Sequence, residues 1–416
     1  MENWQQERNT VNTRHDHVWH LLQTYWYKKD VVLNWEGQRL SLAVAQELFS
    51  SHTVDSGSLL LLRSLDMDTF ANTGTALDFG CGCGVLGLGF KAVKPGWDVT
   101  LIDRDALAVE FSAWNASRLG LDVTCTGGLD TDEISQPPDL VLWNVPGKAG
   151  AGVLQKLTGR ILDRLAQGGM LALVVVHPLA SELEEAIDAH PDVDLVHQEA
   201  GTEHTVMHVR RESVLQQADG TDAFAAGVFD RELTAVDTGL ISYDFLPVVG
   251  IPQYDGPDYA TVLLTDAIEG ADLDAVVSAL VVGPGQGHVP VYLEQQWPEC
   301  QMTLADRDLL ALRASARVLP EHKPVTQWFG AAQPVPGGEA SHDLVTAMLP
   351  RQLRPVVMEF WLDQFLAQLR PGGSLVVGGG STEVSRWIAF ARKRAGMKLR
   401  SRDKRKGFSS ALFQLK

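Results

Sequence analysis

The stretch ALDFGCGCGVLGL, residues 76–88, runs from an apolar segment directly into a turn that is rich in glycine. A second stretch of the same kind, ALVVGPGQGHVPV, occupies residues 279–291. A buried strand that leads into such a turn is typical of nucleotide-binding α/β domains, because glycine lets the backbone approach a ligand closely. The glycines of the two turns align in pairs: Gly80 with Gly283, Gly82 with Gly285, and Gly84 with Gly287.

The likeness between the two halves of the chain continues beyond the turns. At the same offset, TLIDRDALA (100–108) aligns with TLADRDLLA (303–311), so that Asp103 matches Asp306. One further residue of offset brings PDLVLWNVP (138–146) onto HDLVTAMLP (342–350), and Gly168-Gly169 then falls on Gly372-Gly373. Several segments that align at nearly the same offset indicate an internal repeat. The sequence therefore predicts a tandem duplication.

Each copy alternates apolar strands with helical segments. This alternation implies a mostly parallel sheet covered by helices on both faces. We therefore predict an α/β protein made of two tandem Rossmann-like domains, at residues 1–215 and 235–416. The boundary is expected near residues 210–235, where polar and small residues interrupt the pattern.

Composition is consistent with an ordinary globular protein. The chain has 416 residues, of which 45% are hydrophobic and 21% charged, and this length exceeds what one hydrophobic core usually serves. The polar start and the absence of a long apolar run lead us to expect a cytoplasmic protein with no membrane contact. Four cysteines in so long a chain are expected to be reduced thiols, and Cys81 and Cys83 lack the spacing of a zinc site. We expect no metal.

The charge is strongly negative overall and unevenly spread. A net charge of -17 argues against a protein that coats nucleic acid by bulk attraction. Residues 392–416 nevertheless carry ten basic side chains and one acid, Asp403. This segment is interpreted either as solvated surface or as a local contact with RNA phosphates.

Three polar positions in the first copy narrow the nucleotide-binding class. Asp78 precedes the first glycine of the turn, Asp103 ends the next strand, and Asn144-Val-Pro146 follows the fourth strand. A nicotinamide-dependent dehydrogenase would share the glycines but would not need Asp78 or the Asn-x-Pro element. The whole pattern resembles class I S-adenosylmethionine-dependent methyltransferases. The lead-in ELFSSHTVDSGSLLLLRSL (47–65), with its Asp55-Ser-Gly57, is similar to that of the bacterial rRNA guanine-N2 methyltransferases, a family with tandem methyltransferase-like domains.

The resemblance implies S-adenosylmethionine as cofactor and assigns residues to it. The glycines of the turn would pass close to its methionine part, and Asp78 would lie near its amino group. Asp103 would hold the ribose hydroxyls, and Asp130 would meet the adenine amine. The implied cofactor-binding residues are Asp78, Gly80, Gly82, Gly84, Asp103 and Asp130.

Asn144 and Pro146 are the candidate catalytic residues. An amide oxygen and a nearby backbone carbonyl can accept both hydrogens of an exocyclic amine and so turn its lone pair toward the methyl group. In the family an aromatic residue follows this motif and stacks on the base, whereas this chain has Gly147. Trp143 or a more distant ring could replace it. A purely structural alternative makes Asn144 the cap of the following helix.

The second copy has lost several of these groups. Val281 replaces Asp78, Met348 replaces Asn144, and Arg351 stands where Gly147 does. We interpret it as a non-catalytic copy, although the family usually has the degenerate copy first. The favoured hypothesis is a monomeric methyltransferase for a guanine amine in rRNA, acting on rRNA or a ribosomal subunit. A methyltransferase for a small molecule or protein side chain, and a cofactor-binding pseudoenzyme, are the alternatives.

Overall fold

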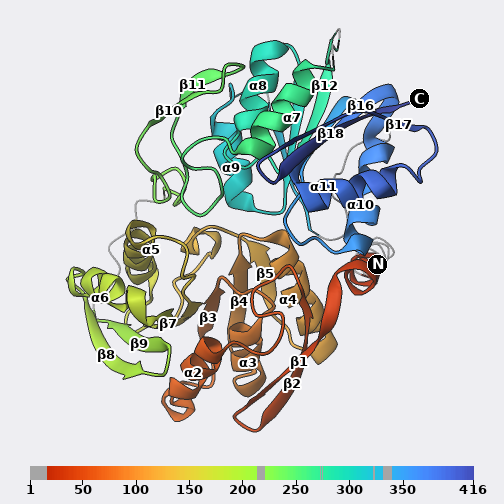
Figure 1. The fold of residues 1–416 in the computed structure, drawn as a ribbon. Coiled ribbons are helices and arrows are strands. Elements are labelled where there is room, and N and C mark those ends of the chain that lie inside the picture. The colour runs from red at the N-terminus through yellow and green to blue at the C-terminus, as the bar shows by residue number, and fades with distance from the viewer. Residues whose placement is uncertain (1–15, 213–220, 272, 274, 322–323, 331–339) are drawn as a thin grey trace, which may run out of the picture. The chain divides into compact units, whose positions relative to one another are not determined.

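The computed structural model describes residues 16–212, 221–271, 273, 275–321, 324–330 and 340–416, which form two compact units. The units are Met1–Phe229 and Asp230–Lys416, and Figure 1 shows the elements of each. The division falls within residues 210–235, where the sequence predicts a boundary. Among the described residues, no helix is both long and apolar enough to cross a membrane.

The first unit is built on one sheet of seven strands. In spatial order β5-β4-β3-β6-β7-β9-β8, the first five strands run parallel, and β9 is antiparallel to both β7 and β8. The strand order reverses at β3, which lies between β4 and β6. The strands are β3 (Thr75–Phe79), β4 (Asp98–Asp103), β5 (Thr124–Gly127), β6 (Leu140–Asn144), β7 (Met170–Val176), β8 (Val193–Ala200) and β9 (His204–Arg211).

Helices connect these strands, and local sequence signals define their ends. Helix α4, for example, begins after Asp105, whose carboxylate accepts a hydrogen bond from the Leu107 backbone N–H at 3.0 Å. Gly120, in the left-handed conformation, caps its other end. The helices are α2 (Ser56–Ser64), α3 (Val85–Val93), α4 (Ala106–Leu119), α5 (Ala151–Arg164) and α6 (Ala180–Asp188). Short helical turns are η1 (Leu22–Trp26), η2 (Met67–Thr69), η3 (Thr131–Glu133) and η4 (His177–Leu179).

A hairpin of β1 (Tyr27–Trp35) and β2 (Gln38–Ala45) precedes the sheet. Asn115 of α4 joins it to the glycine turn. Its amide oxygen accepts from the Ala43 backbone N–H at 2.7 Å, and its amide nitrogen donates to the carbonyls of Ala43 and Cys83, both at 3.0 Å. Because Asn115 is fully buried, these bonds replace water contacts that it could not otherwise make.

The second unit repeats the architecture, which confirms the prediction of two tandem Rossmann-like domains. Its sheet has the order β14-β13-β12-β15-β16-β18-β17, the same pattern as in the first unit. The strands of this sheet are β12 (Ser278–Val282), β13 (Gln301–Asp306), β14 (Pro324–Trp328), β15 (His342–Met348), β16 (Leu369–Gly380), β17 (Met397–Arg405) and β18 (Phe408–Leu415). A separate hairpin consists of β10 (Thr234–Asp237) and β11 (Ser242–Phe245). The helices of the second unit are α7 (Tyr259–Glu269), α8 (His288–Gln296), α9 (Leu309–Arg317), α10 (Pro355–Gln368) and α11 (Ser381–Ala391).

The cores of both units lie around the central parallel strands. Leu77 of β3 and Leu142 of β6 are fully buried, as are Leu280 of β12 and Val345 of β15. Strands covered on both faces need apolar residues on both, and this explains the nearly continuous apolar runs in the sequence.

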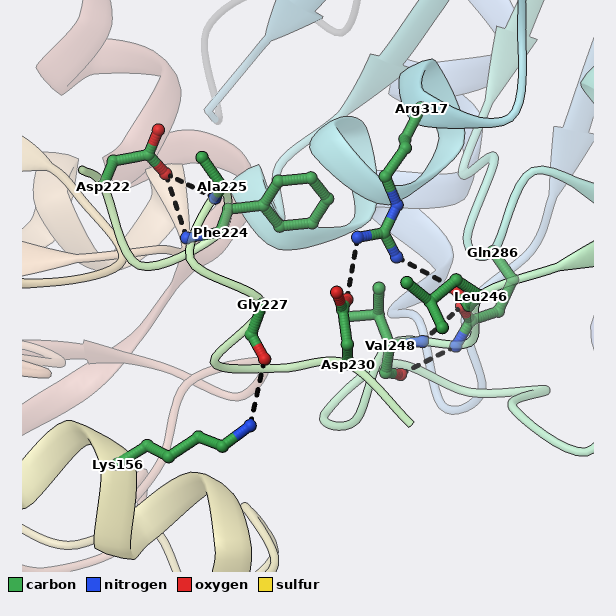
Figure 2. A network of polar contacts seen from close by, with 10 residues as sticks. All are labelled: Lys156, Asp222, Phe224, Ala225, Gly227, Asp230, Leu246, Val248, Gln286 and Arg317. Atoms are coloured by element: carbon green, nitrogen blue, oxygen red, sulfur yellow. Dashed lines mark hydrogen bonds and ion pairs between the residues drawn. The ribbon is translucent and has the colours of Figure 1, made fainter. Parts of the chain in front are cut away.

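Each unit holds its own part of the segment that connects them, as Figure 2 shows in detail. In the first unit, Lys156 of α5 donates to the Gly227 carbonyl at 3.1 Å. In the second, Arg317 of α9 donates to the Asp230 carboxylate at 2.7 Å and to the Leu246 carbonyl at 2.8 Å. The connecting segment is therefore anchored by side chains of both helices.

Candidate active site

The glycine turn follows β3, where the strand order reverses. Gly80, Gly82 and Gly84 have φ values of +74°, +58° and +87°, a conformation that residues with a side chain rarely adopt. A Cβ on Gly80 or Gly82 would meet no atom within 4 Å, whereas one on Gly84 would lie 2.7 Å from Leu88. The space beside Gly80 and Gly82 is thus open to a ligand. Gly84 is needed for the packing of α3.

Asp78 lies buried beside this turn, with 1% of its surface exposed. Its Oδ2 accepts a hydrogen bond from the Gly87 backbone N–H at 2.7 Å. Burial raises the pKa of Asp78 to about 7, and repulsion by Asp103 adds to the increase. A carboxyl group in such surroundings is stabilised in its charged form when a cation approaches. The contact of Asp78 with the amino group of S-adenosylmethionine stays a prediction.

Asp103 ends β4 and faces the same turn. Its Oδ2 accepts from the Gly82 backbone N–H at 3.0 Å, and its Oδ1 accepts from the Asp105 backbone N–H at 2.9 Å. Burial, with repulsion by Asp105, raises the pKa of Asp103 to about 6. Each carboxylate oxygen has a second acceptor position. The carboxylate is therefore held rigidly and can still accept hydrogen bonds from ribose hydroxyls.

Cys81 and Cys83 are free, buried thiols within the turn. Burial raises the pKa of Cys83 to about 12 and also raises that of Cys81, so both are protonated at neutral pH. Cys81 lies 3.4 Å from the hydroxyl of Ser112, which donates to the Gly82 carbonyl at 3.1 Å. In the described part of the chain, no cluster of potential ligands fits a metal ion.

Asp130 follows β5 and is also buried, at 3% exposure. Its Oδ1 accepts from the Thr131 backbone N–H at 2.6 Å, which caps η3, and its Oδ2 forms an ion pair with Arg160 of α5. Arg160 also donates to the Thr221 carbonyl at 2.7 Å. Both oxygens of Asp130 are thus engaged within the first unit. Its contact with Arg160, a residue distant in sequence, could not be inferred from the sequence around Asp130. The contact with adenine stays a prediction.

Asn144 ends β6, and its side-chain orientation is fixed by two acceptors. Its Nδ2 donates to the Oδ2 of Asp55 and to the Oγ of Ser58, both at 2.9 Å. Both amide hydrogens are used in this way, and within the described residues no donor reaches the amide oxygen. The oxygen is therefore left to accept from a ligand. Helix α5 begins at Ala151 with Gly150 at its cap, so the alternative in which Asn144 caps that helix is wrong.

Asp55 and Ser58 come from the start of α2. Asp55 is the N-cap of that helix and accepts from the Ser58 backbone N–H at 3.0 Å. A Cβ on Gly57 would lie 3.0 Å from both Asp55 Oδ2 and the ring of His204, so glycine permits this close approach. Sequence analysis did not assign Asp55 or Ser58 to the site. The signal was the Asp-x-Gly element before a leucine-rich helix.

Trp143, which precedes Asn144, does not supply the stacking ring that is missing at Gly147. The Trp143 ring is 1% exposed and packs edge-on against Phe79, with ring centroids 5.5 Å apart. The interpretation that Trp143 could stack on a ligand is therefore wrong, because both faces of β6 are covered and the ring lies in the core. Pro146 is exposed, and its carbonyl accepts from the Ala149 backbone N–H at 3.1 Å. Phe49, in the loop before α2, is 69% exposed.

The second unit keeps the turn and Asp306 but lacks counterparts of Asp78 and Asn144. Gly283, Gly285 and Gly287 also have positive φ values, of +68°, +54° and +94°. A Cβ on Gly283 would lie 3.2 Å from the Met348 carbonyl oxygen, whereas the corresponding space beside Gly80 is open. Val281, 2% exposed, offers no charge where Asp78 does. These features support the interpretation of a non-catalytic copy.

Part of the first unit is similar in sequence to known proteins. Residues 39–199 match the model of the methyltransferase small domain. Ribosomal RNA small subunit methyltransferase C of Pseudomonas entomophila is 36% identical over 131 residues, and that of Pseudomonas aeruginosa is 38% identical over 135 residues. In both cases the match covers 30% of this chain and 39% of the relative. The match thus spans about two fifths of the length of these curated relatives.

Among solved structures, a T. thermophilus 16S rRNA N2 methyltransferase in complex with AdoMet and guanosine matches with a TM-score of 0.65 and 16% identity. The match covers 93% of this chain and 98% of that one, so the likeness extends through both units and concerns the fold. Residues 39–199 of this chain are therefore similar to the methyltransferase small domain, and the two units together share the tandem two-domain fold of that solved structure.

Proposed function

We propose that this protein transfers a methyl group from S-adenosylmethionine to the exocyclic amine of a guanine in rRNA, and that its first unit is catalytic. The observation that carries the proposal is the oriented amide of Asn144, whose two hydrogens are donated to Asp55 and Ser58. An amide held in this way presents its oxygen as an acceptor. It therefore suits an acceptor group with N–H bonds.

The residues around the glycine turn fit the cofactor. Asp78 would hold its amino group, Asp103 its ribose hydroxyls, and the open faces of Gly80 and Gly82 would take its methionine part. When bound, S-adenosylmethionine supplies a methyl group on a sulfonium that is already a good leaving group. The protein therefore has mainly to position the acceptor.

Asn144 and the backbone next to it would do this positioning. The amide oxygen and the Pro146 carbonyl accept the two hydrogens of the amine, and its nitrogen lone pair then points away from both. Because Asn144 is already oriented in the free protein, little rotational freedom is lost when the acceptor binds. The rRNA substrate is supported by the curated relatives, whose names state this activity. A cytoplasmic location and a monomeric state are part of the same proposal.

A second candidate function is methylation of an amine on a small molecule or protein side chain. The observation that favours it is the lack of a stacking ring beside Asn144, since Gly147 has no side chain and Trp143 is buried. Stacking of a base on an aromatic ring contributes roughly 1 to 3 kcal/mol. A site without such a ring would bind a flipped guanine more weakly.

The test uses cofactor labelled in its methyl group, incubated with the protein and with rRNA, naked or assembled in the small subunit, beside a cell extract without added rRNA. We expect label in RNA. Asn144→Ala should bind the cofactor as the wild type does and transfer no methyl group. The control is Asn34→Ala, an exposed asparagine on β1, which should remain active. Label in a protein or small-molecule fraction would favour the second candidate, and label in no fraction would leave a cofactor-binding pseudoenzyme.

A further inference from the structure

Three aromatic or basic segments of the second unit meet near the carboxyl end of its sheet. Tyr259 is the first residue of α7, Arg351 follows β15, and Arg405, Lys406 and Phe408 surround the turn between β17 and β18. Phe408 pairs with Gly380, the last residue of β16, and α7 packs against β16 and β18, as Figure 1 shows. We call these five residues the basic–aromatic cluster.

The cations of the cluster lie over its rings. The guanidinium carbon of Arg405 is 4.9 Å and the Nζ of Lys406 is 5.0 Å from the centre of the Tyr259 ring. The guanidinium carbon of Arg351 is 5.6 Å from the centre of the Phe408 ring. The two rings are themselves 6.5 Å apart, with an angle of 36° between their planes. Positive charge and two aromatic faces are thus concentrated in one place.

Asp266 of α7 lies near enough to Arg405 for an electrostatic interaction but forms no ion pair with it. Within the described residues, none of Arg351, Arg405 and Lys406 forms an ion pair with a carboxylate. Asp258, which precedes Tyr259, accepts from the backbone N–H groups of Ala260 and Thr261 as the cap of α7. Lys406 forms a hydrogen bond with the hydroxyl of Tyr259 and lowers the pKa of that hydroxyl. The net charge of the protein is -17, so this local excess of positive charge is not a property of the whole surface.

The cluster occupies positions that correspond to residues next to Asp55 and Asn144 in the first unit. Asp258 caps α7 as Asp55 caps α2, so Tyr259 corresponds to Ser56. Phe408 pairs with the end of β16 as His204 pairs with the end of β7. Arg351 corresponds to Gly147 in the sequence repeat. The second unit has therefore exchanged small and polar groups at this edge for cations and rings.

We infer that the basic–aromatic cluster is a binding site for single-stranded RNA, with bases stacked on Tyr259 and Phe408 and phosphates held by Arg351, Arg405 and Lys406. Aromatic faces combined with a basic track are the features that bind single strands without sequence preference. Lys398 of β17 extends the track, because it is exposed and its partner Gln414 lies on the same face of the sheet as Phe408, the partner of Arg405. An acidic peptide would use the cations and leave the rings without a role.

The inference rests on the proposed RNA substrate and is tested apart from methyl transfer. The probe is a fluorescently labelled ten-nucleotide oligouridine, which contains no guanine, titrated with the full chain and followed by anisotropy at several salt concentrations. Tyr259→Ala should weaken binding about tenfold, the loss expected for one stacked base. Arg405→Ala with Lys406→Ala should also weaken binding and should lower the slope of log Kd against log salt by about 0.7 for each cation removed.

The matched control is Lys393→Ala, since Lys393 also lies over a ring, that of Phe390, at 5.6 Å, but outside the cluster. It should bind as the wild type does. Circular dichroism spectra and thermal melts that match those of the wild type show that the second unit is folded in each variant. The inference is overturned if the wild type does not bind oligouridine, if Tyr259→Ala binds it equally well, or if polyglutamate competes as effectively as RNA. Binding through the cluster without methyl label in RNA would instead refute the proposed function and leave this inference standing.

Discussion

The orientation of Asn144 can be tested without changing Asn144 itself. Ser58→Ala removes one of the two acceptors that hold its amide nitrogen, at 2.9 Å, and leaves the Asp55 cap of α2 intact. The amide can then rotate so that its nitrogen faces the incoming amine. Its N–H groups cannot accept the hydrogens of that amine. We expect a slower transfer step with little change in cofactor affinity.

The size of the effect follows from the kind of hydrogen bond lost. A bond between neutral groups contributes about 1 kcal/mol, and one to a charged acceptor about 2 kcal/mol. Because about 1.4 kcal/mol corresponds to a tenfold change in rate, Ser58→Ala should lower kcat about fivefold. Removing Asp55 as well should bring the loss to roughly a hundredfold. The double variant should also lose about 1 kcal/mol of stability, since Asp55 caps α2.

The assay is single-turnover transfer of labelled methyl to rRNA, with cofactor affinity measured separately by calorimetry. Ser64→Ala is the matched control, because Ser64 lies on the same helix and contacts His208 at 2.8 Å, away from Asn144. In an Asn144→Ala background, Ser58→Ala should have no further effect. If Ser58→Ala and the double variant both transfer methyl at the wild-type rate, the orientation of Asn144 does not govern the reaction.

Further predictions concern the glycine turn and the buried carboxylates. Gly80→Ala, at φ +74° with open space around it, should lower stability by about 1 kcal/mol and abolish cofactor binding, whereas Gly120→Ala, at φ +66° and equally open, should cost similar stability and leave cofactor binding intact. Equal cofactor affinities in the two would contradict a ligand beside Gly80. The pKa of Asp78 is raised to about 7 in the folded chain, from 3.8. Between these two pH values the folded chain keeps a proton on Asp78 that the unfolded chain has lost, so the free energy of unfolding should fall by about 4 kcal/mol as pH rises from about 4 to about 7. Asp78→Asn should remove that part of the fall in urea titrations, and an unchanged pH profile would refute the assignment. Arg160→Ala leaves Asp130 buried without its cation and should lower stability by about 3 kcal/mol, and a second change, Asp130→Ala, should restore part of it in thermal melts.

The fold and the cofactor turn were predictable because their signals are local. Strand, turn and acid lie within about thirty residues of one another, and the turn's geometry depends on glycines that are visible in the sequence. The repeat of this pattern then predicted the second unit.

The partners of the buried polar groups could not be predicted in this way. Asp55 reaches Asn144 across 89 residues and Arg160 reaches Asp130 across 30, and no periodicity relates such positions. Trp143 illustrates a different limit, because both faces of β6 are covered by helices and an apolar run does not reveal which side chain faces a ligand. The cluster in the second unit likewise depends on a turn that brings Phe408 to Tyr259.

The central claim is that the first unit binds the sulfonium cofactor, and isothermal titration of the full chain with S-adenosylmethionine tests it most directly. We predict one molecule bound per chain and no measurable binding in Asp103→Ala. An absence of heat with S-adenosylmethionine beside tight binding of a nicotinamide dinucleotide, or wild-type affinity in Asp103→Ala, would contradict the account.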